Sequence, residues 1–206
     1  MHDETIGTFL EELAAKTATP GGGAVAALHA AEAAALIAMV GRYSSGPRYA
    51  EHAKAISGIV SKADELRTES LELAAADAAA FGEVAAAYAL PRDTEEQKTA
   101  RSEAISDALI TAADPPVSVI TTGAELLGLA ERLRPIGNGN VLTDIGAAAE
   151  AIRAAIATGR LNAEVNLGTT ITTPATARYR EVLAGVDALV GRAESLSAAV
   201  RADITR

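Results

Sequence analysis

Apolar residues recur at spacings of three and four along almost the whole chain, and strict alternation of apolar with polar residues is almost absent. The first pattern is typical of amphipathic helices, whereas a half-buried strand alternates with a period of two. Together with the breakers, it predicts helices over residues 3–16, 22–43, 49–89, 94–113, 115–133, 144–157, 160–170 and 173 onward. We therefore predict an all-α fold, an antiparallel helical bundle in which 49–89 is one very long helix.

Caps and helix breakers set the limits of these helices. The residue before a proline is pushed out of the α region, so Pro20, Pro47 and Pro91 mark helix ends. Side chains that accept a hydrogen bond from a free N–H group mark helix starts. The expected N-caps are Asp3, Thr94 in a capping box with Gln97, Thr143 or Asp144, and Thr173 ahead of Pro174. No repeat or long linker interrupts the chain, and we predict that residues 1–206 form a single domain.

Composition and charge narrow the range of partners. The chain has 206 residues, of which 49% are hydrophobic, many of them alanine, and only 3% are aromatic. The net charge of −9 argues against a nucleic-acid partner, because phosphate binding needs a basic face. With no cysteine and three scattered histidines, we expect no disulfide and no metal site. The polar N-terminus is unlike a signal peptide, and a cytoplasmic location is expected.

Residues 24–40 form the most apolar segment of the chain. A membrane span needs about 17–25 apolar residues, whereas this segment is short, rich in alanine and interrupted by His29 and Glu32. We interpret it as a helix buried inside a bundle or at a subunit interface, and we expect no membrane partner.

The turn Pro20-Gly21-Gly22-Gly23 precedes this apolar helix. Three glycines remove every β-carbon from the approach to a helix N-terminus, where free N–H groups and the helix dipole favour a carboxylate, a phosphate or a ring carbonyl. The glycines could equally serve only a tight turn and close helix contact. The residues alone leave both interpretations open, and the spacing matches neither of the common nucleotide-binding glycine motifs.

Asp77 lies in a run of alanines, and Phe81 follows one turn later on the same helix face. If that face is packed, the carboxylate must find a partner elsewhere or hold a raised pKa, as general acids often do. On a solvated face, Asp77 is an ordinary surface acid. The sequence leaves this choice open.

Further polar residues are candidates for a binding site. Asn138 and Asp144 follow a glycine-rich segment and could read the edge of a heterocycle, or they could only shape the loop and cap a helix. Asn162 and Asn166 share one helix face, which hints at a buried polar contact, because amides are mildly unfavourable inside helices; the alternative is simple exposure. Arg48 could hold an anionic tail or be a solvated charge.

In this order, these segments resemble the C-terminal domain family of formiminotransferase-cyclodeaminase, which includes cyclodeaminase domains and stand-alone methenyltetrahydrofolate cyclohydrolases. The resemblance covers the chain from about residue 5 to the last helix. The segments that carry it are Thr19-Pro20-Gly21-Gly22-Gly23-Ala24-Val25, Asp77-x-x-Ala80-Phe81, Leu90-Pro91, Gly137-Asn138, Asp144 and Asn162-x-x-x-Asn166-Leu167.

The resemblance implies an all-helical homodimer that binds a tetrahydrofolate one-carbon derivative near the subunit interface, with no metal and no cofactor beyond the folate. It implies one or both of two reactions. A cyclodeaminase closes 5-formimidoyltetrahydrofolate to the 5,10-methenyl ring with loss of ammonia, and a cyclohydrolase interconverts the methenyl ring and 10-formyltetrahydrofolate. Both need a proton-transfer group and negative charge near a cationic centre.

Roles for individual residues follow as hypotheses. We expect Asp77 or Asp144 to act as the acid or base, asparagines to orient the pterin or the one-carbon unit, the glycine turn to lie along the ligand, and Arg48 to meet the glutamate tail. The expected substrate-binding residues are Pro20, Gly21, Gly22, Gly23, Arg48, Asn138, Asn162 and Asn166.

The sequence also departs from the family pattern. Ala24 and Thr143 stand where serine is common, and no formiminotransferase segment is present in this sequence, which favours the cyclohydrolase reaction. A competing interpretation is a non-catalytic helical-bundle module that uses the same groove for protein contacts. Asp77 and Asp144 argue against it, because a scaffold would not need acids at alanine-lined positions.

Overall fold

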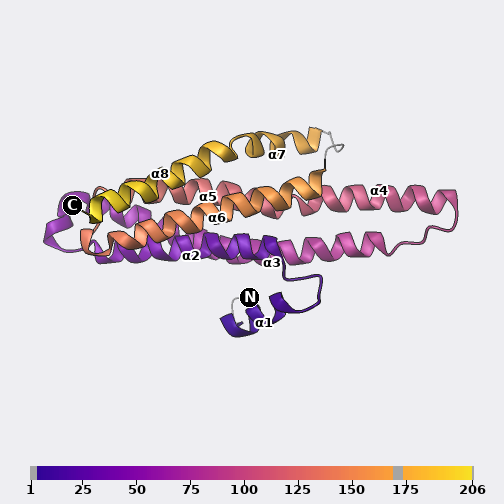
Figure 1. Ribbon diagram of the computed structural model, residues 1–206, viewed down its shortest axis with the longest axis horizontal. Helices are drawn as coiled ribbons and strands as arrows, with labels where there is room; N and C mark the ends of the chain where they lie inside the picture. Colours follow the sequence, from indigo (N-terminus) through magenta and orange to yellow (C-terminus); the bar gives the residue numbers. More distant parts are fainter. Residues whose placement is uncertain (1–3, 169–173, 206) are drawn as a thin grey trace.

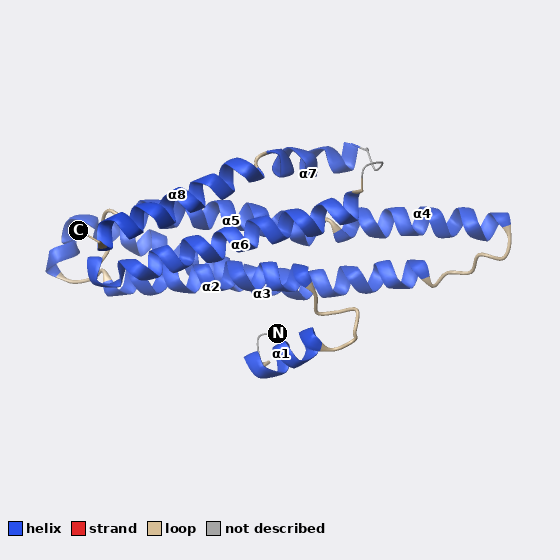
Figure 2. Cartoon of the chain, viewed as in Figure 1, coloured by secondary structure: helices blue, strands red, loops and turns tan. Residues whose placement is uncertain are grey.

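A computed structural model describes residues 4–168 and 174–205, and every regular element within these ranges is a helix (Figure 2). The predicted all-α fold is therefore confirmed. The α-helices are α1 (Ile6–Ala14), α2 (Gly22–Tyr43), α3 (Ala53–Tyr88), α4 (Glu95–Ala112), α5 (Asp114–Leu133), α6 (Leu142–Leu167), α7 (Pro174–Ala184) and α8 (Val186–Ile204). Two short 3-10 helices, η1 (Pro47–His52) and η2 (Gly139–Val141), precede α3 and α6.

Helix α2 is the centre of the bundle and packs against α3, α5 and α6. Its buried positions are mostly alanines, and side chains this small let neighbouring helices approach closely. By length and hydropathy α2 could cross a membrane, with a mean hydropathy of 1.8 in its most apolar window, but 61% of that window is buried inside the protein. This burial fits the predicted core helix.

Two parts of the chain extend away from the bundle. Helix α3, with 36 residues, continues past the start of α2 and pairs there with α4 in a projecting hairpin, at the right of Figure 1. Helix α1 hangs to one side of α2 and α3 (Figure 1), and its buried Phe9 belongs to the main core. The hairpin leaves one stretch of α3 uncovered directly beyond the first turn of α2.

Several predicted helix limits are corrected by the structure. The first helix starts after Thr5, whose side chain accepts from the N–H of Thr8, so Asp3 is not its N-cap. The capping box of Thr94 and Gln97 is confirmed. The last predicted helix is interrupted at Gly185 and forms α7 and α8. The predicted cap Thr173 lies outside the described residues.

The predicted segments 144–157 and 160–170 join in one helix, α6, which ends at Leu167, and residues 169 and 170 lie outside the described residues. The N-cap position of α6 is Val141 instead of Thr143 or Asp144. Gly159 lies inside α6 and does not end it. A β-carbon at Gly159 would come within 3.0 Å of the carbonyl oxygen of Pro116 on α5. The glycine therefore serves close contact between two helices rather than a break.

Candidate active site at the start of helix α2

The first turn of α2 is built to admit a carboxylate from another helix. Gly21 occupies the N-cap position and offers no side chain to the free N–H groups of the helix. The carboxylate of Asp77, from α3, takes the place of a capping side chain, since the backbone N–H of Ala24 donates to it. It lies so close to the turn that a β-carbon on Gly23 would overlap it. No residue larger than glycine fits at position 23 while Asp77 keeps this place. The glycines therefore serve close helix contact, and the group that they admit is a carboxylate of the chain itself.

Burial controls the chemistry of Asp77. Its side chain is half-buried, and the loss of water around it raises the pKa of the carboxyl above its usual range. The backbone N–H of Ala24, which donates to the carboxylate, offsets part of this effect by lowering the pKa. Among the described residues, no Lys, Arg or His forms an ion pair with Asp77. A desolvated carboxyl of this kind is suited to proton transfer closer to neutral pH.

The amide pair of α6 lies partly at the same place. Asn162 packs on the glycine turn, where a β-carbon at Gly22 would be 3.3 Å from its Nδ2. That Nδ2 donates to the carbonyl of Thr158 at 2.8 Å, and no donor among the described residues reaches its Oδ1. Asn166 donates to the carbonyl of Ala112 at 2.8 Å and so closes the end of α4. The predicted buried polar contact is present, but only Asn162 adjoins the glycine turn.

The remaining predicted site residues lie at the opposite end of the bundle. Asn138 donates from Nδ2 to the carbonyl of Tyr43, the last residue of α2, at 3.0 Å. Helix α2 has 22 residues and is about 33 Å long, so Asn138 is far from Gly23. Asp144 and Asn162 stand at the two ends of α6, about 27 Å apart along its axis. One protomer therefore does not bring Asp77 and Asp144 together.

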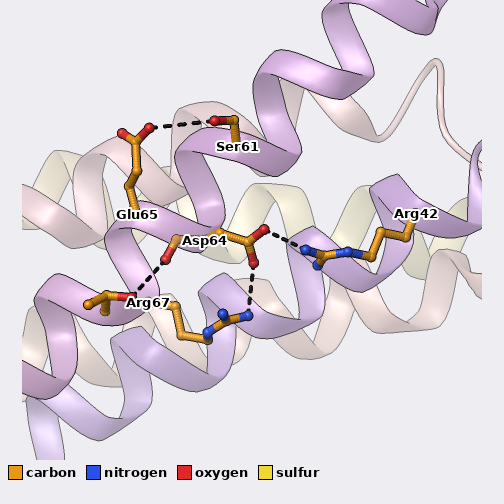
Figure 3. Close-up of polar contacts among 6 residues, drawn as sticks. Arg42, Ser61, Asp64, Glu65 and Arg67 are labelled. Atoms are coloured by element: carbon orange, nitrogen blue, oxygen red, sulfur yellow. Dashed lines mark hydrogen bonds and ion pairs between the residues drawn. The ribbon is translucent and has the colours of Figure 1, made fainter.

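Arginine residues also gather at this far end. Arg42 of α2 and Arg67 of α3 both donate to the carboxylate of Asp64, as Figure 3 shows. Arg48 lies in η1, is exposed, and has its guanidinium carbon 5.7 Å from the ring centre of Tyr49. Sequence reasoning missed Asp64, although Asp64 and Arg67 have the three-residue spacing of a helical ion pair.

Beside these arginines lies a cavity of about 250 Å³. Its lining residues include Arg42, Ser45 and Ser57 together with the apolar Ile56 and Val60. Within the part of the chain that the structure describes, no three Asp, Glu, His or Cys side chains converge in a way that could hold a metal ion. The two ends of the bundle thus offer different chemistry, a desolvated acid at one and cations with hydroxyls at the other.

Comparisons with known proteins agree with the resemblance seen in the sequence. A family model described as formiminotransferase-cyclodeaminase matches residues 5–184. The methenyltetrahydrofolate cyclohydrolase of Methylorubrum extorquens is 39% identical over 165 residues, which cover 80% of this chain and 79% of that protein. The formimidoyltransferase-cyclodeaminase of Rattus norvegicus is 31% identical over 166 residues, which cover 80% of this chain but only 31% of the rat protein.

A solved structure supports the same relationship. The crystal structure of formiminotetrahydrofolate cyclodeaminase from Thermotoga maritima superimposes with a TM-score of 0.86 and 26% sequence identity, over 100% of this chain and 99% of that one. The relatives named here are enzymes of folate one-carbon chemistry. The chain belongs to the formiminotransferase-cyclodeaminase family.

Proposed function

We propose that this protein is a folate one-carbon enzyme, a methenyltetrahydrofolate cyclohydrolase, and that Asp77 is its proton-transfer group. The observation that carries the proposal is the placement of Asp77. Its desolvated carboxylate lies against the first turn of α2, where only a glycine at position 23 leaves room for it. The activity for which the Methylorubrum extorquens relative is named supports the choice of reaction, because the match covers most of both chains.

In the hydrolytic direction, a water molecule attacks the methenyl carbon of the substrate. The Asp77 carboxylate takes a proton from this water as the carbon–oxygen bond forms. The same proton then passes to N5 as the bond between N5 and the carbon breaks. The hydroxyl of the adduct loses its own proton to solvent as its oxygen becomes the carbonyl of the formyl group on N10. A carboxyl with a raised pKa suits both steps, because it is a stronger base than an ordinary aspartate and an acid that stays protonated closer to neutral pH.

The ammonia-releasing reaction uses the same groups. N10 attacks the formimidoyl carbon and gives up its own proton to the departing nitrogen, which needs one further proton before it leaves as ammonia. A protonated Asp77 would supply that proton, and its charged form would then lie beside the cationic methenyl product. We propose this as the second activity, in accord with the names of the rat and Thermotoga maritima relatives.

Binding of the folate would begin at the glycine turn. We propose that Pro20 to Gly23 lie along the ligand and that Asn162 presents its Oδ1 acceptor to the pterin ring. We also propose that the reaction needs no metal and no cofactor beyond the folate, because every bond change in it is a proton transfer or an addition to carbon. Treatment with a chelator should then leave the rate unchanged.

We propose a homodimer formed through the solvent-facing side of α2. Helical periodicity places apolar side chains within about 40° of the exposed Glu32, on a side of α2 that α3, α5 and α6 leave open. These residues are Val25, Leu28, Leu36, Met39 and Tyr43. Because Glu32 is near the middle of α2, an antiparallel pair of these helices would set the start of one α2 beside the end of the other. Arg48 and Asn138 of the second copy would then be near the start of α2, and we propose that Arg48 meets the glutamate tail there.

The test follows the absorbance of methenyltetrahydrofolate with purified protein, starting separately from the methenyl and the formimidoyl compounds. We expect the protein to consume the former and to produce it from the latter. No acceleration of either reaction would overturn the proposed function and favour the non-catalytic module. Light scattering of the wild-type protein and of Leu36→Glu tests the dimer, which the buried charge should dissociate.

A further inference from the structure

Phe81 is an aromatic side chain that the fold leaves uncovered. The chain has only two phenylalanines, and the other, Phe9, is 6% exposed in the core. Phe81 is 42% exposed, although the surrounding stretch of α3 is otherwise mostly alanine. Burying an aromatic ring contributes strongly to the stability of a small core. Core packing therefore does not explain why Phe81 lies at the surface.

Its position relates it to the candidate active site. Phe81 follows Asp77 by one turn of α3, about 6 Å further along the axis and about 40° around it. Asp77 faces Gly23 in the first turn of α2. Because α2 begins there, it cannot cover the next turn of α3, which lies beyond that level. A β-carbon at Gly21 would meet nothing within 4 Å, so the approach to this turn is open. Figure 1 shows the hairpin of α3 and α4 projecting past the start of α2.

We infer that Phe81 is a specificity-determining residue whose ring packs against the fused ring system of the folate while the one-carbon unit lies at Asp77. This inference rests on the proposed function. An aromatic face attracts flat heterocycles, and it attracts them more strongly when they carry positive charge. The methenyl compound is a cation with its charge spread over N5, the bridging carbon and N10, whereas the 10-formyl compound is neutral at these atoms.

The inference therefore makes a prediction about selectivity. Phe81 contributes more to binding of the cationic methenyl form than to binding of the neutral 10-formyl form. Loss of the ring should weaken methenyl binding by about tenfold and 10-formyl binding by a smaller factor. Because Phe81 does not move a proton, kcat should change much less than KM.

The experiment compares Phe81→Leu, which keeps an apolar side chain, with Phe81→Tyr, which keeps the ring. KM and kcat are measured with the methenyl compound, and equilibrium titration gives the affinity for the methenyl and 10-formyl compounds. Phe81→Leu should raise KM about tenfold, and Phe81→Tyr should stay near the wild-type value. Tyr88→Leu is the matched control, because it removes a 53% exposed ring from the same helix, two turns beyond Phe81.

Two results would overturn the inference while the wild-type protein remains active. One is a Phe81→Leu protein with wild-type KM and affinities, and the other is an equal change for Tyr88→Leu. A change of molecular mass in solution with unaltered affinity would show that Phe81 contacts a second copy instead. If the wild-type protein neither binds nor converts the methenyl compound, the proposed function fails first and the role of Phe81 falls with it. Because Phe81 is so exposed, both variants should melt within a few degrees of the wild type, which thermal unfolding checks.

Discussion

The two ends of helix α2 both carry polar side chains, and they differ in how these side chains are satisfied. At the C-terminal end, Ser44 donates to the carbonyl of Val40 at 2.7 Å and accepts from the N–H of Asn138 at 2.8 Å. At the N-terminal end, the N-cap is a glycine without a side chain, and Asp77 reaches in from another helix at a cost in hydration. The first arrangement stabilises a helix end by ordinary capping. The second leaves a carboxyl whose ionisation the fold opposes, and this difference is the reason for proposing that end as the reactive one.

Replacing the two aspartates separately gives the sharpest test of this contrast. Asp77→Asn keeps the shape of the side chain but cannot transfer a proton, so we expect kcat/KM to fall by about 10²–10⁴. Asp144→Asn, at the other end of α6, should stay within a few-fold of the wild type. Initial rates with the methenyl compound measure both. An equal loss in Asp144→Asn would show that both ends work together, and mixing the two variants should then restore activity if the site is shared between copies.

Adding a single methyl group to the glycine turn tests the contact between Gly23 and the Asp77 carboxylate. Gly23→Ala places a β-carbon where the carboxylate lies, and a displacement of about 1 Å is enough to lower kcat by about 10². Gly21→Ala is the matched control for kcat, because its β-carbon would meet nothing within 4 Å and its φ of −140° suits any residue, so Asp77 keeps its place. Since Gly21 is proposed to lie along the ligand, this variant can change KM but should not change kcat. Rates and circular dichroism are measured together. If Gly21→Ala loses as much activity as Gly23→Ala, the turn itself is required and the contact with Asp77 is not the reason.

The sequence predicted the helices and the reactive residue types but not which helix ends meet. Apolar spacing located α2 and α5 closely, because a buried face imposes its period on the residues. The contact between Gly23 and Asp77 joins residues 54 positions apart, and no local signal reports such a contact. For the same reason, Asp144 was grouped with Asp77 although α6 holds it at the far end.

Helix limits were predicted less well than helix existence, as the first and sixth helices illustrate. Asp3 and Thr5 are both acceptable N-caps by residue type, and only the hydrogen bond from Thr8 to Thr5 distinguishes them. The segments 144–157 and 160–170 were predicted separately, yet Gly159 between them lies inside α6. Glycine has a low helix propensity, but packing against Pro116 of α5 makes it the residue that fits. Tertiary contact overrode local preference at this position.

Removing the hydroxyl at the other end of α2 should affect stability and leave activity unchanged. Ser44 is 2% exposed and takes part in two hydrogen bonds, so Ser44→Ala leaves the buried N–H of Asn138 without its acceptor. We expect a loss of about 1–2 kcal/mol, seen as a lower midpoint in urea. The rate per folded molecule should match the wild type. A large fall in rate without loss of stability would show that the Ser44 hydroxyl itself takes part in the site that we propose at the dimer interface.

The smallest expected effects are the most discriminating, because removal of a carboxylate should have opposite signs at the two ends. Burial raises the folded-state pKa of Asp77 above its usual value of 3.8, so the folded protein holds this proton more tightly than the unfolded chain. Stability from this group is present below the unfolded pKa and is lost as the pH rises through the folded pKa. Asp77→Asn removes that loss, and at neutral pH its melting temperature should exceed the wild type's by about 1–3 °C.

Asp64→Asn provides the opposite case. Its carboxylate joins Arg42 to Arg67 in a partly exposed ion pair, so the variant should be destabilised by about 0.5–1 kcal/mol at neutral pH, and less in high salt. Melting curves of both variants from pH 4 to pH 8 measure the two signs. The gain for Asp77→Asn should grow as the pH rises and shrink as the pH falls toward the unfolded-state pKa of 3.8. If Asp77→Asn were destabilised like Asp64→Asn at every pH, Asp77 would be an ordinary structural cap. The two ends of α2 would then differ in sequence but not in chemistry.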